Sequence, residues 1–140
     1  MNSRIIYLLV LSLSLWGLFT VAQGAEKEKV AVAEAKQWLS LVDAGKYEQS
    51  WIEAAEYFRN AVSQDKWEQS LQAVRSPLGK LISREVKSTM YKTSLPGAPD
   101  GEYVIIHFDT SYSNKKSAIE TVTPMLEKDG SWRVTGYYIK

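Results

Sequence analysis

The sequence contains no cysteine and only one histidine among its 140 residues. The lack of cysteine excludes disulfide bonds, a thiolate nucleophile and a lipid-modified cysteine. Metal binding would have to rest on carboxylates, and the Asp and Glu residues lack the spacing of a calcium-binding loop. A phosphate-binding loop, a dinucleotide fingerprint and a Ser/His/Asp arrangement are also missing. We therefore predict neither a metal site nor a cofactor.

An excess of positive charge is missing as well. Arg4 is the only charged residue within residues 1–24, so the 17 basic residues of the chain leave 16 basic against 16 acidic residues in the remainder. A domain without net positive charge releases few counterions from a phosphate backbone. We therefore predict no nucleic-acid partner.

The one long apolar run lies at the start of the chain. It extends from residue 5 to residue 18 after a short basic segment and precedes the small residues Ala22 and Gly24. This order is typical of a secretory signal peptide cut after Gly24, which would leave a periplasmic or secreted protein without a membrane anchor. The alternative is an uncleaved anchor, but the run is short for a bilayer span of about 20 residues.

Residues 25–29 form a charged leader, and the pattern of residues 30–140 indicates one domain. Apolar residues at spacings of three and four predict three helices, over residues 30–42, 47–62 and 65–78. The second helix carries Trp51 and Phe58 on one stripe, so we expect these rings to fill the centre of the fold. Asp65 and Glu68 have the spacing of a capping box for the third helix.

The rest of the chain predicts strands. They span residues 81–95, 102–112, 118–127 and 132–139, joined by turns that include an Asp-Gly hairpin at residues 129–130. Pro124 indicates a bulge or an edge position. Helices followed by hairpins predict an α+β fold, with three N-terminal helices packed on a curved, four-stranded antiparallel meander sheet.

Alternation assigns side chains to the two faces of these strands. In the first strand the face expected to be buried carries Ile82, Arg84, Val86, Ser88 and Met90. In the last strand Tyr138 lies on the face of Trp132. The second strand is apolar on both faces at its start, around residues 103–106. Its outer side therefore requires a cover, either another element or a second subunit in a homodimer.

This order of elements resembles the cone-shaped nuclear-transport-factor-two-like fold, also called cystatin-like. Five motifs span the chain: D-x-G-x-Y-x-x-S-W at 43–51, R-S-P-L-G at 75–79, L-P-G-A-P-D-G-E-Y at 95–103, E-T-V at 120–122 and D-G-S-W-R-V-T-G-Y at 129–137. With the signal peptide, they make the chain similar to a bacterial exported family, domain of unknown function 4019 (DUF4019). That resemblance implies the cone-like fold and no established activity.

His107, Asp109 and Glu120 are the candidate catalytic residues. His107 and Asp109 share one strand face, and on a concave face they would form a proton-transfer pair. We favour the alternative of a partly buried histidine on the convex face, because such pairs often arise by chance. Either Asp109 or Glu120 would be the general base of an isomerase or cyclase.

Arg75, Arg84, Tyr112, Trp132 and Tyr137 are the candidate ligand-binding residues. The two arginines would clamp an anion or carboxylate, and the aromatic rings would form pocket walls. We favour a structural ion pair between Arg84 and Glu120, because charged residues inside alternating strands usually satisfy each other.

Three functions remain open from the sequence. The first, which we favour, is an exported non-catalytic domain that binds a small molecule, a peptide or a partner protein in the cone between helices and sheet. The second is the small isomerase or cyclase. The third is a structural module that dimerises through the outer face around Tyr103 and Ile105.

Overall fold

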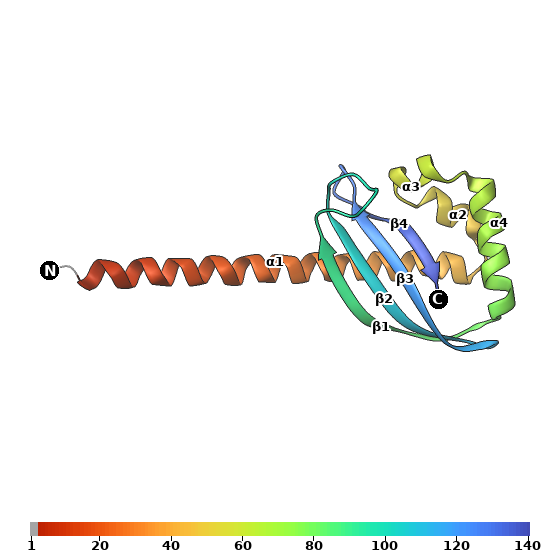
Figure 1. The fold of residues 1–140 in the computed structure, drawn as a ribbon, viewed down its shortest axis with the longest axis horizontal. Helices are drawn as coiled ribbons and strands as arrows, with labels where there is room; N and C mark the ends of the chain where they lie inside the picture. Colours follow the sequence, from red (N-terminus) through yellow and green to blue (C-terminus); the bar gives the residue numbers. More distant parts are fainter. Residues whose placement is uncertain (1–2) are drawn as a thin grey trace.

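The computed structural model describes the backbone of residues 3–140 and the side chains of residues 21–140. Over these residues the fold is α+β, as predicted (Figure 1). The elements in chain order are α1 (Ser3–Asp43), α2 (Tyr47–Ile52), α3 (Glu56–Ala61), α4 (Gln64–Arg75), the 3-10 helix η1 (Ser76–Leu78), β1 (Leu81–Lys92), β2 (Tyr103–Tyr112), β3 (Lys115–Leu126) and β4 (Trp132–Ile139).

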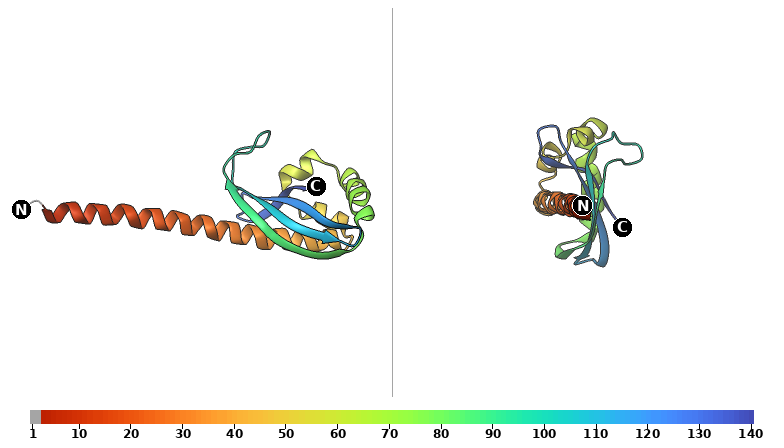
Figure 2. Two further views of the ribbon diagram at one scale, coloured as in Figure 1. Left: turned by 60° about the horizontal axis from the view of Figure 1, so that its bottom comes forward. Right: turned by 90° about the vertical axis from the view of Figure 1, so that its left-hand side faces the viewer.

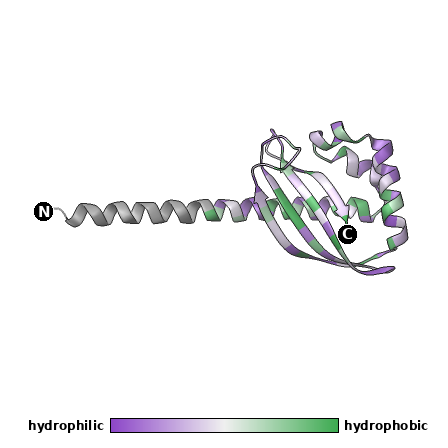
Figure 3. Cartoon of the chain, viewed as in Figure 1, coloured by the Kyte–Doolittle hydropathy of each residue, from purple (hydrophilic) through white to green (hydrophobic). Residues whose placement is uncertain are grey.

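The four strands form one antiparallel meander in the order β1-β2-β3-β4. The last part of α1 lies along one face of this sheet, which we call the inner face (Figure 2). Hydrophobic and hydrophilic residues alternate along the strands (Figure 3), so that Val104, Ile106 and Phe108 point inward and are fully buried. The opposite, outer face carries the intervening residues of each strand.

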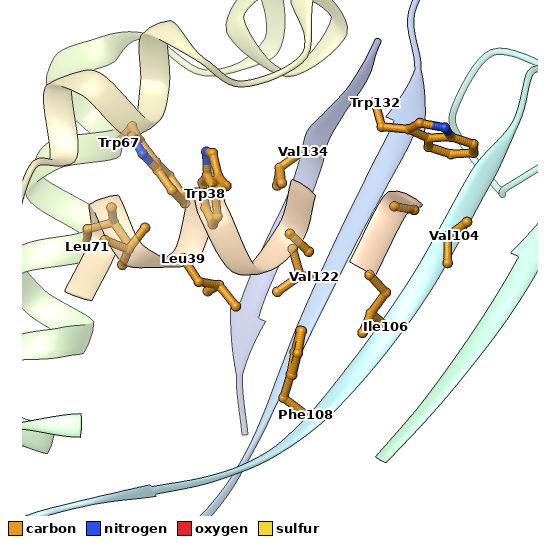
Figure 4. Close-up of a cluster of buried hydrophobic side chains, with 13 residues drawn as sticks. Trp38, Leu39, Trp67, Leu71, Val104, Ile106, Phe108, Val122, Trp132 and Val134 are labelled. Carbon is orange, nitrogen blue, oxygen red and sulfur yellow. The ribbon is translucent and has the colours of Figure 1, made fainter. Parts of the chain in front are cut away.

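The core lies between α1 and the inner face. Ala31, Ala35 and Leu39 of α1 are fully buried, and Trp38 is 4% exposed. The labelled side chains of Figure 4 show α1 and the sheet meeting in this cluster. Small residues at Ala31 and Ala35 let the helix backbone approach the sheet closely, while Trp38 and Leu39 fill the space beyond.

The prediction that Trp51 and Phe58 fill the centre of the fold is wrong. Both are only partly buried and pack against the edge of the core. The predicted helix over residues 47–62 is also two helices, α2 and α3. It breaks because the backbone N–H of Ala55 donates to the carbonyl of Val134 in β4 at 2.8 Å, so the connection is tied to the sheet edge.

Two other helix boundaries differ from the prediction. Residues 25–29, expected to precede the first helix, belong to α1. Lys27 contacts Glu102 at 2.5 Å, which ties this turn to the sheet. The helix α4 is capped by Ser63, whose hydroxyl accepts from the Lys66 N–H, rather than by the predicted box at Asp65.

A bulge in β4 reverses the predicted faces of its last residues. Thr123 of β3 pairs with Gly136, but Pro124 pairs with Val134, so Thr135 is an extra residue. Proline has no N–H for the ladder, which explains the irregularity predicted at Pro124. Beyond the bulge Tyr137 points inward, whereas the alternation had placed it on the opposite face from Trp132 and Val134.

Two irregularities also interrupt the alternation of β1. The register shifts between residues 81 and 83 and between residues 86 and 88. Ile82, Val86 and Met90, predicted to be buried, are 65%, 39% and 49% exposed. Val86 still pairs with the inward residue Phe108, so its exposure follows from the edge position of β1 and not from a change of face. The less exposed positions of this edge strand are Leu81, Arg84, Thr89 and Tyr91.

None of the helices, within the part of the chain that the structure describes, is long and apolar enough to cross a membrane. The predicted signal peptide over residues 1–24 falls largely outside the residues whose side chains are described, and it stays a prediction.

Candidate functional site

Polar side chains gather on the inner face where α1 and α4 end. The group contains Arg75, Arg84, Tyr112, Glu120 and Tyr137 of the predicted candidates, and the structure adds Asp43 and Thr110. We call these seven residues the inner polar cluster. They come from all four strands and from the last residue of α1 and of α4.

Glu120 lies at the centre of this cluster and is fully buried. Its Oε1 accepts from the Arg84 Nε at 2.6 Å and from the Thr110 hydroxyl at 2.7 Å. Its Oε2 accepts from the Arg84 Nη2 at 3.2 Å and from the Tyr137 hydroxyl at 2.5 Å. The ion pair predicted between Arg84 and Glu120 is therefore present, and hydrogen bonds occupy both carboxylate oxygens.

Asp43 joins the two arginines. It accepts from the Arg84 Nη1 at 2.7 Å and from the Arg75 Nη2 at 2.9 Å. Burial alone would raise the pKa of Asp43, but the hydrogen bonds and charges of Arg84 and Arg75 lower it below its usual value. The same balance, with Arg84 as the main partner, lowers the pKa of Glu120.

The two tyrosines of the cluster are held in the neutral form. Burial and the nearby charge of Glu120 raise the pKa of Tyr137 well above its usual value, and they raise the pKa of Tyr112 to about 12. The Arg75 guanidinium lies over the Tyr112 ring, 5.0 Å from its centroid. Arg75 Nε, Arg75 Nη1 and the Tyr112 hydroxyl have no hydrogen-bond partner among the residues that the structure describes, and the cation–π contact compensates part of that cost.

The contacts of the inner polar cluster favour a structural role over a role in proton transfer. A general base needs a free lone pair and access for a substrate. Glu120 has four donors on two oxygens and no exposed surface. Two carboxylates and two arginines balance their charges, so the cluster ties the ends of α1 and α4 to the sheet.

The other two candidate catalytic residues lie on the outer face. His107 Nδ1 is 3.0 Å from the Ser88 hydroxyl, and Asp109 lies 3.7 Å from Lys87. They are therefore separated by the sheet from Glu120, and the interpretation of a pair on the concave face is wrong. His107 lines a hollow of about 180 Å³ on the outer face, which we call the outer hollow; its lining is Lys87, His107, Ile119, Thr121, Tyr138 and Lys140.

A second hollow lies between α4 and β4. It has a volume of about 170 Å³, and we call it the α4–β4 groove; its lining is Trp67, Ser70, Leu71, Val74, Tyr137, Tyr138 and Ile139. Val74 and Tyr138 are 47% and 57% exposed. Tyr137 connects the groove to the inner polar cluster, because its ring lines the groove while its hydroxyl donates to Glu120.

Trp132 does not join either hollow described above. It is 7% exposed and belongs to the core cluster near the other end of the sheet (Figure 4). Among the residues that the structure describes, no group of three or more His, Asp and Glu side chains is placed to hold a metal ion.

Several motif residues hold turns rather than line a cavity. Gly79 has a φ of 75°, and a Cβ there would lie 2.1 Å from the Ser113 hydroxyl oxygen. Ser50 is fully buried, accepts from the Trp67 indole at its hydroxyl and accepts from the Trp38 indole at its carbonyl. These contacts give the motifs a structural explanation that does not require a ligand.

The sequence interpretation missed Asp43, Thr110, Val74, Lys87 and Lys140. A signal existed for Asp43, because a carboxylate at a helix C-terminus faces the negative end of the helix dipole and needs a cation nearby. Val74, Lys87 and Lys140 are exposed, and Lys140 follows the last residue of β4. Their grouping depends on the register of the strands and on the position of α4, for which no local signal exists.

Comparison with known families gives one match over most of the domain. The family model of DUF4019, described as a protein of unknown function, matches residues 34–137. No curated protein matches the sequence. The matched range begins within α1 and includes the whole inner polar cluster. The chain therefore belongs to the DUF4019 family.

Proposed function

We propose that this protein is a non-catalytic binding domain, and that its α4–β4 groove takes an apolar side chain from an extended segment of a partner protein. The groove itself is the observation that carries the proposal. Trp67 and Tyr137 form its walls, and aromatic walls of this kind often anchor a partner side chain. Val74 and Tyr138 expose apolar surface at its rim.

The size of the groove supports a side chain over a whole small molecule. Pockets for small molecules usually have volumes of about 300–1,000 Å³. The α4–β4 groove has about 170 Å³. The cone between α1 and the sheet, where the sequence suggested a ligand, is occupied by Trp38, Leu39 and Phe108. For this groove, a side chain of a peptide or protein is therefore better supported than a whole small molecule.

The edge of β4 supports an extended segment. In the sheet, β4 pairs with β3 along one of its edges. Along its opposite edge, the carbonyl of Val134 accepts a hydrogen bond from the Ala55 N–H. Among the described residues, no helix or loop backbone pairs with that edge over residues 136–139. An extended segment can add to a free strand edge through its backbone and place alternate side chains in adjacent hollows.

A peptide selection tests this proposal. A random library is selected against the purified domain, and the affinities of the recovered peptides are measured by isothermal titration calorimetry. We expect peptides with apolar residues two positions apart. Val74→Glu should weaken their binding at least about tenfold, because it places a charge at the groove. Val86→Glu on β1 is the matched control and should leave the affinity unchanged.

Peptides that bind Val74→Glu as tightly as the wild type would contradict the proposal. So would a selection that yields no peptide with apolar residues in this spacing. Neither the catalytic nor the dimeric alternative has a comparable observation in its favour. Glu120 has no free lone pair, and Tyr103, expected at a dimer interface, is fully buried by its own chain with its hydroxyl bonded to the Pro99 carbonyl.

A further inference from the structure

We propose that the outer hollow is a binding site for a phosphate group. This site lies on the opposite face of the sheet from the core. It shares Tyr138 with the α4–β4 groove but no other residue, and it does not require that the groove bind a peptide. Among the residues that the structure describes, its lining includes two lysines and no acidic residue. By contrast, the hollow lined by Glu56, Arg59, Glu127, Lys128, Asp129 and Arg133 has as many acidic as basic residues.

The strand register brings the donors of this site together. Ser88 pairs with His107, His107 with Thr121, and Thr121 with Tyr138, so that four side chains capable of hydrogen bonding form one row across the sheet. Thr121 is only 6% exposed, which places its hydroxyl at the floor of the row. A row of hydroxyls and an imidazole offers several donors to one ligand.

Two lysines line the outer hollow beside this row of side chains. Lys87 is the extra residue of the second irregularity in β1, between Val86 and Ser88, and it lines the outer hollow. Bulges commonly redirect a side chain in this way next to functional sites. Lys140, the residue after β4, pairs through its backbone with Ile119 and lines the same hollow. Two lysines from the two edge strands of the sheet therefore line one space.

The geometry favours a tetrahedral oxyanion over a carboxylate. Planar carboxylates are best matched by the fork of an arginine, whereas lysine binds phosphate as a compact point charge. The lining contains lysines and hydroxyls from different strands and no arginine. When the Ser88 hydroxyl donates to His107 Nδ1, the ring proton is on Nε2, which can then donate to the anion.

One carboxylate competes with the anion. Asp109 lies 3.7 Å from Lys87, and both side chains are more than half exposed. Such an exposed pair is weak, at most about 1 kcal/mol, so an anion can draw Lys87 away from it. This competition gives the proposal a variant that should tighten binding, since Asp109→Asn removes the competitor without touching the donors.

Titration with inorganic phosphate at low ionic strength tests the site. Amide chemical shifts of Thr121 and Tyr138 are followed by NMR, with acetate as the comparison anion. Lys87→Gln and Lys140→Gln should each weaken phosphate binding about fivefold, and Asp109→Asn should tighten it about threefold. Lys128→Gln and Asp100→Asn make the same charge changes away from the hollow and should leave the affinity within about a factor of two of the wild type.

A second experiment distinguishes a phosphate group on a lipid headgroup from a soluble phosphate. Vesicles of phosphatidylcholine with and without phosphatidic acid are sedimented with the protein, and binding that depends on phosphatidic acid, Lys87 and Lys140 assigns the site to a lipid headgroup. Saturable shifts with inorganic phosphate alone assign it to a soluble phosphate. The proposal is overturned if neither probe binds, if acetate binds as tightly as phosphate, or if Lys128→Gln weakens binding as much as Lys140→Gln.

Discussion

The inner and outer faces of the sheet carry polar residues under opposite conditions. On the inner face Glu120 is fully buried, the Arg84 side chain is 10% exposed, and the two are connected by hydrogen bonds of 2.6 and 3.2 Å. On the outer face Lys87 and Asp109 lie 3.7 Å apart, with 51% and 62% of their side chains exposed. The charges of the inner face are therefore fixed by their neighbours, while those of the outer face are available to a ligand.

This difference follows from the cost of burying a charge. A buried ion without a partner is so unfavourable that the fold must supply one, and Glu120 obtains four donors. An exposed ion is solvated by water and needs no protein partner. Polar residues that look catalytic in the sequence can thus be structural on one face, whereas ordinary surface residues on the other can form a site.

The largest contrast should come from two neighbours on β2. Phe108→Ala removes a fully buried ring from the core and should lower the free energy of unfolding by about 3–5 kcal/mol. His107→Ala, one residue earlier on the outer face, should change it by less than about 1 kcal/mol. Urea unfolding followed by tryptophan fluorescence measures both. Equal losses would show that the outer face is packed as tightly as the inner one.

Removal of a single buried charge should have the next largest effect. Glu120→Gln keeps the shape of the side chain but leaves Arg84 without its buried partner, so the free energy of unfolding should fall by about 3 kcal/mol. Glu85→Gln makes the same substitution at an exposed position of β1 and is the control, with an expected change within about 0.5 kcal/mol. Glu120→Gln as stable as Glu85→Gln would contradict the structural role of the cluster.

The turn beneath the cluster gives a smaller contrast. Gly79 has φ 75° and ψ −151°, a conformation that is essentially restricted to glycine, and its missing Cβ leaves room for Ser113. Gly79→Ala should lower the free energy of unfolding by about 1–3 kcal/mol. Gly45→Ala is the comparison for a positive φ without a clash, since Gly45 has φ 73° but no atom within 4 Å of an added Cβ. A loss in Gly79→Ala no larger than in Gly45→Ala would contradict the contribution of the Ser113 contact.

Much of this fold could be predicted from the sequence. The hairpin turn at residues 129–130 and the four strands follow from local patterns, and all four strands are present. The face of the sheet on which each side chain lies was harder to predict, because the alternation rule assumes an unbroken register. The extra residue Thr135 reverses that assignment for Tyr137 and Tyr138, and the bulge position depends on pairing with Pro124 in another strand.

The candidate site was predicted less well, for a related reason. The Arg84–Glu120 pair could be predicted because an alternating strand rarely buries a charge without a partner. The contribution of Asp43 required the packing of α1 against the sheet, and the outer hollow required the register of four strands. Likewise, the sequence predicted Phe58 at the centre of the core, whereas the structure has Trp38 there. The predicted helix is broken because the Ala55 N–H donates to the sheet edge.

The smallest effect should appear in the dependence of stability on pH. Asp43 and Glu120 have lowered pKa values in the folded protein, against ordinary values of 3.8 and 4.5. Below about pH 5 the unfolded chain therefore takes up protons that the folded protein does not, so the free energy of unfolding falls as the pH decreases. Each such proton contributes a slope of about 1.4 kcal/mol per pH unit, and the stability that these groups provide is fully present above about pH 6.

Asp43→Asn removes the contribution of Asp43 to this pH dependence and leaves that of Glu120. The variant should be less stable than the wild type at pH 7, and its free energy of unfolding should decrease less steeply between pH 5 and pH 3, by up to about one proton. Asp100→Asn, an exposed substitution of the same kind, is the control and should keep the wild-type slope. Urea unfolding at several pH values provides the measurement. If Asp43→Asn has the wild-type slope, the Asp43 contacts do not depress its pKa, and the inner face would differ from the outer one in burial but not in electrostatics.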